Sequence, residues 1–380
     1  MRGYGLQKNA PIRLSFNREN YEGLIERHGQ WVRWLRAKKC TCVLSNGRPD
    51  LNCPRCGGDG WVYETQKTAE ETLTLAYSAG SLELPYVDAK VLGIYDYMGL
   101  EYQVSERYGK YCKISGGRTP DQGEKMQVII ERPLVKTIAQ AQLNYHSHGC
   151  FSADGLKVAG YKGVANENNT AVEILSCSAI TNVTRGITYT PVSYRRNMIF
   201  VDFPQGVVEP AANDVLIALN VQYIEPFLFA IVGQQQREPD WKYLESIGGD
   251  ASMTFPHWAA VGEGDIITVL ADSQVGKRII ERLPDYFDTV PEYYLYSIDY
   301  IEAGADKYYP GQDFDLWGAN KIRWYTNVPK VGTPIFVMYR YCPTYRVIRE
   351  FPNVRSGENQ QFPRRVALKL LQTYAERKPI

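Results

Sequence analysis

Four of the eight cysteines lie close together in a stretch rich in turn-forming residues. They form two pairs separated by ten residues, Cys40 with Cys42 and Cys53 with Cys56. Four thiolates presented from two tight turns are the ligand set of a tetrahedral Zn²⁺ site. Because an all-cysteine site leaves no open position for water, the spacing predicts a structural zinc and not a catalytic one.

The residues around these cysteines predict a small knuckle with almost no hydrophobic core. Pro54 stiffens the second turn, and the glycines that follow let backbone N–H groups point toward the sulfur atoms. Residues 46–50, NGRPD, favour a turn-rich loop over a helix. Disulfides and unligated thiols are the alternatives, and disulfides need an oxidising compartment of which the sequence gives no sign.

A nucleic-acid-binding role is the functional alternative for this region. Arg33 and Arg36 precede the cysteines in a basic run and Arg55 lies inside the second pair, so these three are the candidate phosphate contacts. Asp50 and Asp59 offset the arginines of the knuckle, which weakens its attraction for a polyanion. A solvated strand face or a contact with an acidic partner is the favoured interpretation of the basic run.

A second group of metal-ligating residue types occurs in the segment HSHGC. His146 and His148 would lie on one face of a strand, and Cys150 could join them in a second metal site. Exposed polar residues beside a buried thiol are the favoured interpretation, because the chain has only four histidines.

A pair of acidic residues lies beside a tryptophan in the segment GQDFDLWG. Asp313, Asp315 and Trp317 are the one place where a carbohydrate-active or adhesive protein would build an aromatic cleft with carboxylates. Turn-forming roles are favoured for both acids, because no facing carboxylate has a recognisable spacing. The motifs of serine hydrolases, P-loop proteins, zinc proteases and calcium loops do not occur in the sequence, so we expect no enzymatic activity.

The composition indicates a turn-rich β protein with large contact surfaces. The 380 residues include 28 tyrosines, 32 glycines and 21 prolines, a combination that favours short strands and aromatic interfaces. The net charge of +1 gives the chain as a whole no attraction for a polyanion. The sequence has no secretory signal and no apolar window long enough to span a membrane, which predicts cytoplasmic synthesis and no membrane partner.

The order of turns and alternating segments predicts a mainly β fold. We expect two or three small β-barrel or β-sandwich modules with an N-terminal zinc knuckle and short helices. Residues 1–39 would form an arm, a short helix and a strand, and residues 40–64 the knuckle. Three β modules and a C-terminal helix or arm would follow, spanning residues 65–144, 145–226, 227–350 and 351–380.

Helical patterns occur in a few segments only. They are RENYEGLIERHG after a capping Asn17 (residues 18–29), WKYLESIGG (241–249), VGKRIIERLPDYF (275–287) and PRRVALKLLQTYAERK (363–378). The segment KTIAQAQLNY (136–145) fits a short helix or a strand. Strands are expected at residues 31–39, 61–64 and 266–270.

One pattern occurs in both the second and the third expected module. Each has a strand that begins at an asparagine, Asn197 or Asn320, then a Pro-Gly loop and a long alternating strand that ends at Tyr223 or Tyr341. We interpret this as a degenerate duplication of one β-hairpin unit, with chance similarity as the alternative.

The knuckle also carries resemblances to known families. The segment CPRCGGDG is similar to one CxxCxGxG unit of the zinc region of Hsp40 chaperones, which supports a zinc turn. Hsp40 proteins have four such units, whereas this chain has one unit, paired with a CxC, and no helical J-domain. The match therefore does not support a chaperone.

A wider resemblance connects the knuckle to the rest of the chain. The segments GQWVRWLRAKKCTCV and GRPDLNCPRCGGDGWVYE resemble a family of tailed-bacteriophage structural proteins encoded among head–tail joining genes. The C-terminal segments IRWYTNVPKVGTPIFVMYRYCPTYRVIRE and FPRRVALK resemble β domains of phage virions. Together these motifs cover about a quarter of the chain. The knuckle is the more specific part.

The resemblance implies a virion protein of the phage neck, that is, a head-closure, connector or collar subunit. Such a subunit works as a closed ring, commonly of six or twelve copies, between the DNA-filled head and the tail. Its expected partners are copies of itself, the adjacent portal or connector protein, and tail-terminator or collar proteins, with double-stranded DNA passing through the ring. A tail or baseplate protein and a zinc-dependent nucleic-acid-binding protein are the alternatives. The expected location is the virion, after assembly in the host cytoplasm.

Overall fold

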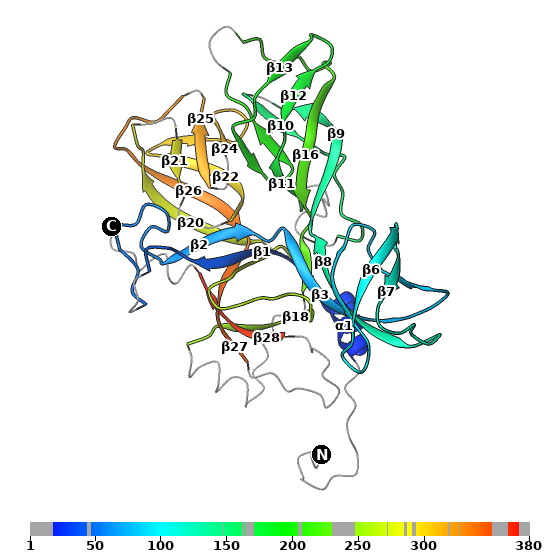
Figure 1. Ribbon diagram of the computed structural model, residues 1–380. Helices are drawn as coiled ribbons and strands as arrows, with labels where there is room; N and C mark the ends of the chain where they lie inside the picture. The colour runs from blue at the N-terminus through cyan, green and yellow to red at the C-terminus, as the bar shows by residue number, and fades with distance from the viewer. Residues whose placement is uncertain are drawn as a thin grey trace.

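The computed structural model describes residues 18–371 apart from internal gaps. These gaps are residues 44–46, 147, 162, 164–170, 204–206, 230–247, 272, 285–286, 291–293, 318–319, 326 and 352–363. The described elements are one helix and the strands β1 to β28 (Figure 1), so the expected mainly β fold is confirmed. The expected N-terminal arm, and the helix expected at 241–249 except for its last two residues, lie outside the described residues.

A central sheet gathers strands from both ends of the chain and from its middle. Its order is β17-β1-β19-β27-β28-β18, with β2 paired to β1. Val32 and Trp34 point from β1 into a core that also contains Phe229 and Phe255. Its strands are β1 (Gln30–Lys39), β2 (Trp61–Thr65), β17 (Phe227–Phe229), β18 (Ala251–Phe255), β19 (Ile266–Val269), β27 (Thr344–Glu350) and β28 (Arg364–Leu370).

Three further modules are inserted between the strands of the central sheet. The first module lies between β2 and the second module, and its six strands have the order β3-β8-β5-β6-β7-β4. It surrounds a core that contains Leu82, Leu84 and Met126. Its strands are β3 (Thr68–Ala76), β4 (Ser81–Glu83), β5 (Lys90–Tyr95), β6 (Glu101–Tyr108), β7 (Tyr111–Ser115) and β8 (Lys125–Pro133).

The second module follows directly and has the order β13-β12-β16-β9-β10-β15-β14, with β11 also on β16. Its longest strand pair joins β9 and β16, so the segment 136–145 is a strand of this module and the expected boundary at residue 144 falls within it. Its strands are β9 (Val135–Tyr145), β10 (Cys150–Ser152), β11 (Glu173–Ser176), β12 (Ala179–Asn182), β13 (Ile187–Tyr189), β14 (Ser193–Arg195), β15 (Met198–Phe200) and β16 (Leu216–Ile224).

The third module lies between β19 and β27 and consists of two sheets, β20-β26-β22-β23 and β21-β25-β24. The two sheets share a core that contains Phe314, Trp324 and Tyr339. Its strands are β20 (Gln274–Glu281), β21 (Phe287–Thr289), β22 (Leu295–Ala303), β23 (Asp306–Tyr308), β24 (Phe314–Trp317), β25 (Lys321–Trp324) and β26 (Pro334–Tyr341).

The second and third modules have the same strand order. If β20 to β26 are replaced in turn by β9, β10 and β12 to β16, the strand order of the third module becomes that of the second. In this correspondence β11 and β12 together match the single strand β22. The one difference is that β20 and β21 belong to separate sheets, whereas β9 and β10 are paired. The expected hairpin unit is wrong, because β15 does not pair with β16, nor β25 with β26. The equivalence extends over whole modules.

The helix expected at residues 18–29 is confirmed as α1 (Arg18–His28), and Gly29 N–H donates to Ile25 O at 2.7 Å after its last residue. Two other helical predictions are wrong. Residues 274–281 form the edge strand β20, and residues 364–370 form β28 between β27 and β18. Val366, Ala367 and Leu368 are all buried there, so the strand lacks the alternation that would distinguish it from a helix.

Candidate metal centre

The knuckle, residues 40–60, is an excursion at the end of the β1–β2 hairpin. Lys39 pairs with Trp61, and Cys40 N–H extends the ladder by donating to Gly60 O at 2.8 Å. Among its described residues only Cys40, Cys53 and Gly60 are buried, and none belongs to a strand or helix. Hydrophobic burial is therefore too small to hold this segment in shape, and another source of stability is needed.

The four cysteine sulfur atoms converge on one point. All four Sγ atoms lie within 4.8 Å of one another, with Cys40 and Cys53 3.8 Å apart and Cys42 and Cys56 3.5 Å apart. A tetrahedron of thiolates at zinc–sulfur distances of about 2.3 Å has edges of about 3.8 Å. All four cysteines are free thiols, at separations far from the roughly 2 Å of a disulfide bond. The arrangement can hold a tetrahedral metal ion.

Backbone turns place the second cysteine pair. Gly57 N–H donates to Cys53 O at 2.9 Å, and Gly60 N–H points at Cys56 Sγ at 3.3 Å. Gly58 has a φ of 86°, in the left-handed region, and a Cβ there would lie 2.7 Å from Leu51 O. The chain needs glycine at this position to turn back from the cysteines.

The thiols differ in how readily they lose a proton. Backbone N–H groups of Cys56 and Arg55 hydrogen-bond to the Cys53 sulfur and lower the pKa of that thiol to about 7. Burial raises the pKa of Cys42 to about 12. Metals bind thiolates, so Cys53, which has the lowered pKa, is the first of the four to become a ligand as the pH rises. A bound cation would help to deprotonate the others.

One contact ties the knuckle to the central sheet beyond its own hairpin. Arg346 of β27 reaches Asp59 at 3.4 Å and donates to the Tyr63 hydroxyl at 2.7 Å. Leu51, within the knuckle, is 80% exposed. The knuckle thus has a fixed base and a tip that projects into solvent.

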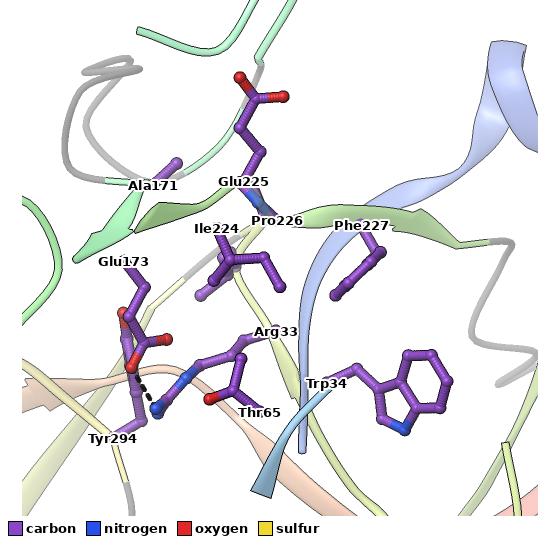
Figure 2. Close-up of a pocket in the computed structure, with 11 residues that line it drawn as sticks. Arg33, Trp34, Thr65, Ala171, Glu173, Ile224, Glu225, Pro226, Phe227 and Tyr294 are labelled. Atoms are coloured by element: carbon purple, nitrogen blue, oxygen red, sulfur yellow. Dashed lines mark hydrogen bonds and ion pairs between the residues drawn. The ribbon is translucent and has the colours of Figure 1, made fainter. Parts of the chain in front are cut away.

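Arg33, the first candidate phosphate contact, is held at a junction between modules. Its guanidinium forms an ion pair with Glu173 of β11 and lies 5.3 Å from the ring of Tyr294 (Figure 2). Arg33 and Glu173 line a small pocket together with Trp34, Ile224 and Phe227. This geometry gives Arg33 a structural partner in place of a phosphate.

The three candidate arginines do not form one surface. Strand alternation puts Arg33 and Arg36 on opposite faces of β1. Arg36 is exposed and Arg55 lies on the knuckle, with its Nη1 3.5 Å from Thr41 Oγ1. The nucleic-acid contact stays a prediction, and the structure leaves Arg36 and Arg55 exposed for it.

The three residues of the second candidate metal site do not form a cluster, which agrees with the interpretation favoured from the sequence. His146 Nε2 lies 2.8 Å from Ser152 Oγ, His148 stacks on Tyr325 with ring centroids 3.8 Å apart, and Cys150 is buried. Within the described part of the chain, the knuckle cysteines are the only group of three or more side chains placed to share a metal ion.

The acidic pair of the third module stabilises a turn. Asp313 accepts a hydrogen bond from Tyr309 N–H, and Asp315 accepts from Gly311 N–H and from the Tyr325 hydroxyl. Trp317 is buried, with the ring of Phe200 4.5 Å away. The geometry agrees with turn residues and not with an aromatic cleft.

Sequence reasoning missed the residue that fixes the strand leading to the knuckle. Asp265 is buried and accepts hydrogen bonds from Trp34 Nε1 at 2.9 Å, Ala37 N–H at 2.8 Å and Gly262 N–H at 3.0 Å. In the sequence it is an ordinary acid in a Gly-rich loop, and its partners on β1 are more than two hundred residues away. No local signal could have shown this contact.

The described helix is too short to cross a membrane.

Comparisons with known proteins do not assign the chain to a family. No protein-family model matches the chain, and no curated protein matches it with significance. The four-cysteine cluster and the β modules therefore have to support the functional argument themselves.

Proposed function

We propose that the protein is a non-catalytic virion subunit of a tailed bacteriophage, which forms a closed ring in the neck and binds a structural zinc ion. The convergence of four cysteine sulfur atoms on an exposed excursion of the central sheet carries this proposal. Partners would be further copies of the chain, the portal or connector protein on the head side and a tail-terminator or collar protein on the tail side, with double-stranded DNA passing through.

Zinc is the metal that suits this donor set best. Four thiolates with no fifth ligand favour a closed tetrahedral site, and the sulfur separations agree with that geometry. Because the knuckle has almost no core, metal binding would supply most of its folding free energy. The bound ion would convert a loop into a rigid projection fixed to the sheet through Arg346.

A mechanical role fits the way in which the projection is built. The knuckle is anchored on β1, and β1 is also the strand that contacts the second module through Arg33 and Glu173. A force on the tip is therefore transmitted to the central sheet and to the modules around it. The resemblance of the knuckle motif to neck proteins supports the phage neck as the place where such a joint is used.

Zinc content and location in the particle test the proposal together. We expect one zinc per chain in the purified protein, and gold-labelled antibody against the chain on the neck of intact particles. Labelling of the baseplate would favour the tail or baseplate alternative. A metal-free protein that binds DNA with an affinity falling steeply with salt would contradict the proposal.

A further inference from the structure

The four-stranded sheet of the third module exposes its outer face. Strand pairing sets Lys277, Met338 and Tyr300 in one row across β20, β26 and β22, and sets Ile279, Phe336 and Glu302 in the next. The alternate residues of β26 are buried in the module core, so these rows point away from it. None of the six is buried, and Ile279 is 71% exposed.

The fold itself does not require such a face, as the second module shows. Its equivalent rows are Gln140, Leu219 and Ala179, and Gln142, Ile217 and Thr181. The central strand is apolar in both modules, but the strands on either side carry small or uncharged polar residues in the second module. The third module has Ile279 and Tyr300 instead. The wide apolar surface is particular to the third module.

Charges of both signs surround this apolar surface. Lys307 lies 3.5 Å from Glu302, and Arg340 lies 3.5 Å from Asp299. Lys277 and Glu281 follow along the β20 edge. Three cations and three anions balance, which suits a protein surface of low net charge and not a polyanion or an anionic membrane. A second copy of this chain, with its net charge of +1, fits that requirement.

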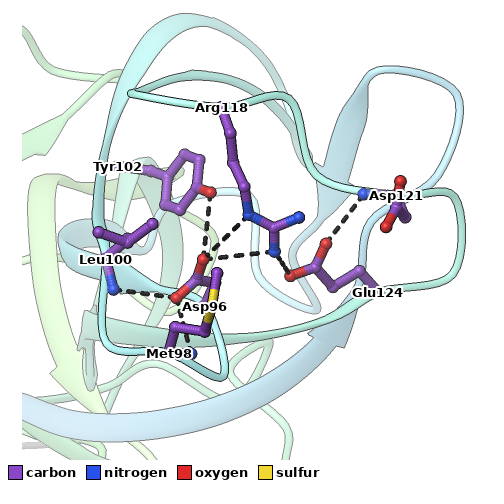
Figure 3. A network of polar contacts seen from close by, with 7 residues as sticks. All are labelled: Asp96, Met98, Leu100, Tyr102, Arg118, Asp121 and Glu124. Carbon is purple, nitrogen blue, oxygen red and sulfur yellow. Dashed lines mark hydrogen bonds and ion pairs between the residues drawn. The ribbon is translucent and has the colours of Figure 1, made fainter.

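The first module carries an exposed apolar tip at the β5–β6 turn. Tyr97, Met98 and Leu100 are 75%, 56% and 47% exposed. Asp96 is buried beneath them and accepts hydrogen bonds from Met98 N–H and Leu100 N–H, each at 2.9 Å (Figure 3). The tip is thus an apolar surface on a loop of fixed shape.

A polar network holds this loop from below. Arg118 reaches Asp96 at 3.4 Å and also pairs with Glu124, and the Tyr102 hydroxyl donates to Asp96 at 3.3 Å (Figure 3). The same guanidinium lies 5.7 Å from the ring of Tyr97. These contacts order the tip although its apolar side chains bury little area in the chain itself. Ordering a loop before binding lowers the entropic cost of binding, which is typical of recognition loops.

The first module, which carries the tip, and the sheet of the third module lie on opposite sides of the molecule. In Figure 1, β6 and β7 of the first module are at the right edge, and β20 and β26 of the third module are at the left. We propose that the tip of one copy docks on the outer sheet face of the third module of the next copy. Met98 and Leu100 would contact Ile279 and Phe336.

Such a contact joins two different surfaces, so it repeats from copy to copy and generates a ring when the rotation closes. The inference deepens the proposed neck ring, on which it rests, by naming the side-to-side contact. It requires no metal, because neither surface includes the knuckle.

Light scattering on matched variants tests the contact. Wild-type protein is expected to form an oligomer, whereas Ile279→Glu and Met98→Glu are each expected to be monomers with unchanged far-UV circular dichroism. Gln142→Glu places the same charge at the equivalent position of the second module, and it should assemble like wild type. Ile279→Gln, which copies the residue of the second module, should weaken assembly without adding charge.

A mixing experiment distinguishes this contact from a symmetric one. The Ile279→Glu chain keeps its tip and the Met98→Glu chain keeps its sheet face, so an equimolar mixture should form a complex of one copy of each. A wild-type protein that stays monomeric at every concentration would overturn the inference, as would variants that keep the wild-type mass or a mixture without the complex. An oligomer insensitive to both variants would leave the neck proposal intact, since zinc content and particle location test that separately.

Discussion

At the scale of single residues, the knuckle could be predicted because its signal is local. Four cysteines within one short stretch limit where the sulfur atoms can lie, and the structure brings all four within 4.8 Å. The arginines and histidines could not be placed in the same way, because their partners come from distant strands. Arg33 pairs with Glu173, and His148 stacks on Tyr325. The type of residue was visible in the sequence, but its neighbour was not.

Removing the second cysteine pair should unfold the knuckle alone. In the variant Cys53→Ser with Cys56→Ser, we expect zinc to fall from one per chain to none and proteases to cut within residues 40–60. The thermal unfolding of the β modules should change little, because the knuckle shares almost no core with them. Cys177→Ala, which replaces a buried thiol outside the knuckle, should keep the metal and the protease resistance. Unchanged resistance in the double variant would contradict the metal-dependent fold.

The metal-free knuckle should have one reactive thiol. The pKa of Cys53 is lowered to about 7 by N–H groups of Cys56 and Arg55, so its thiolate is half formed near that pH and predominates above it. The pKa of Cys42 is raised to about 12 by burial. Alkylation followed by mass spectrometry should modify Cys53 first, with a rate that rises about tenfold per pH unit below pH 7 and then levels. Zinc should block the reaction, and faster modification of Cys42 would contradict the assignment.

At the scale of strands, local sequence patterns predicted some strands correctly but indicated helices in place of the edge strand β20 and the buried strand β28. The buried strand at 266–270 and the strand leading to the knuckle agree with β19 and β1. The strand β20 was mistaken for a helix because exposed Val275 and Ile279 stand four residues apart, which is also a helical spacing. Its pairing with β26, far along the chain, decides the outcome.

Among the residues that fix β1, Asp265 should be the one whose substitution lowers the free energy of unfolding most. Asp265→Ala leaves buried N–H groups of Trp34, Ala37 and Gly262 without their acceptor, so we expect unfolding free energy to fall by about 3 kcal/mol or more. Asp265→Asn keeps an acceptor oxygen and should cost less. Chemical denaturation followed by tryptophan fluorescence measures both, and Glu263→Ala, an exposed acid in the same loop, should change the stability by less than about 0.5 kcal/mol.

The same side chain gives the stability a pH dependence. Burial raises the pKa of Asp265 in the folded protein, although its N–H partners act in the opposite direction. Folding therefore favours the neutral carboxyl group. Its contribution to the free energy of unfolding is complete below the pKa of the unfolded state and is lost as the pH rises through the pKa of the folded state. Wild type should lose stability relative to Asp265→Asn over that window. An identical pH profile for the two proteins would contradict the raised pKa.

At the scale of the whole molecule, the central sheet could not have been predicted. Its strands come from residues 30–39, 61–65, 227–229, 251–255, 266–269, 344–350 and 364–370, with three modules inserted between them. Each strand is short, and its sequence shows only which of its own side chains alternate between buried and exposed. The pairing of β1 with β19, or of β27 with β28, depends on which apolar surfaces are still uncovered when the modules have folded. The repeated pattern at Tyr223 and Tyr341 did indicate equivalent strands, since Tyr341 is the last residue of β26 and Tyr223 the last but one of β16. The shared strand order agrees with the expected duplication, which stays a prediction.

The contact between the second and third modules should decide whether they unfold together. Arg195 and Arg196, at the β14–β15 turn, both donate to Leu295 O at the start of β22, at 2.7 and 2.9 Å. The Arg196 guanidinium also lies 4.5 Å from the ring of Tyr296. Because these bonds cross from one module to the other, Arg195→Met with Arg196→Met should weaken the coupling and keep most of the apolar volume.

Scanning calorimetry should then show two transitions where the wild type shows one. Arg185→Ala is the matched control, since Arg185 pairs with Asp214 at 2.7 Å inside the second module. It should lower the stability of that module without splitting the transition. A single transition in the double methionine variant would mean that the two arginines do not decide the coupling, and that other contacts, such as Phe200 on Trp317 and His148 on Tyr325, hold the modules together. A subunit that transmits force between its two faces needs such coupling, because modules that unfold independently would yield one at a time.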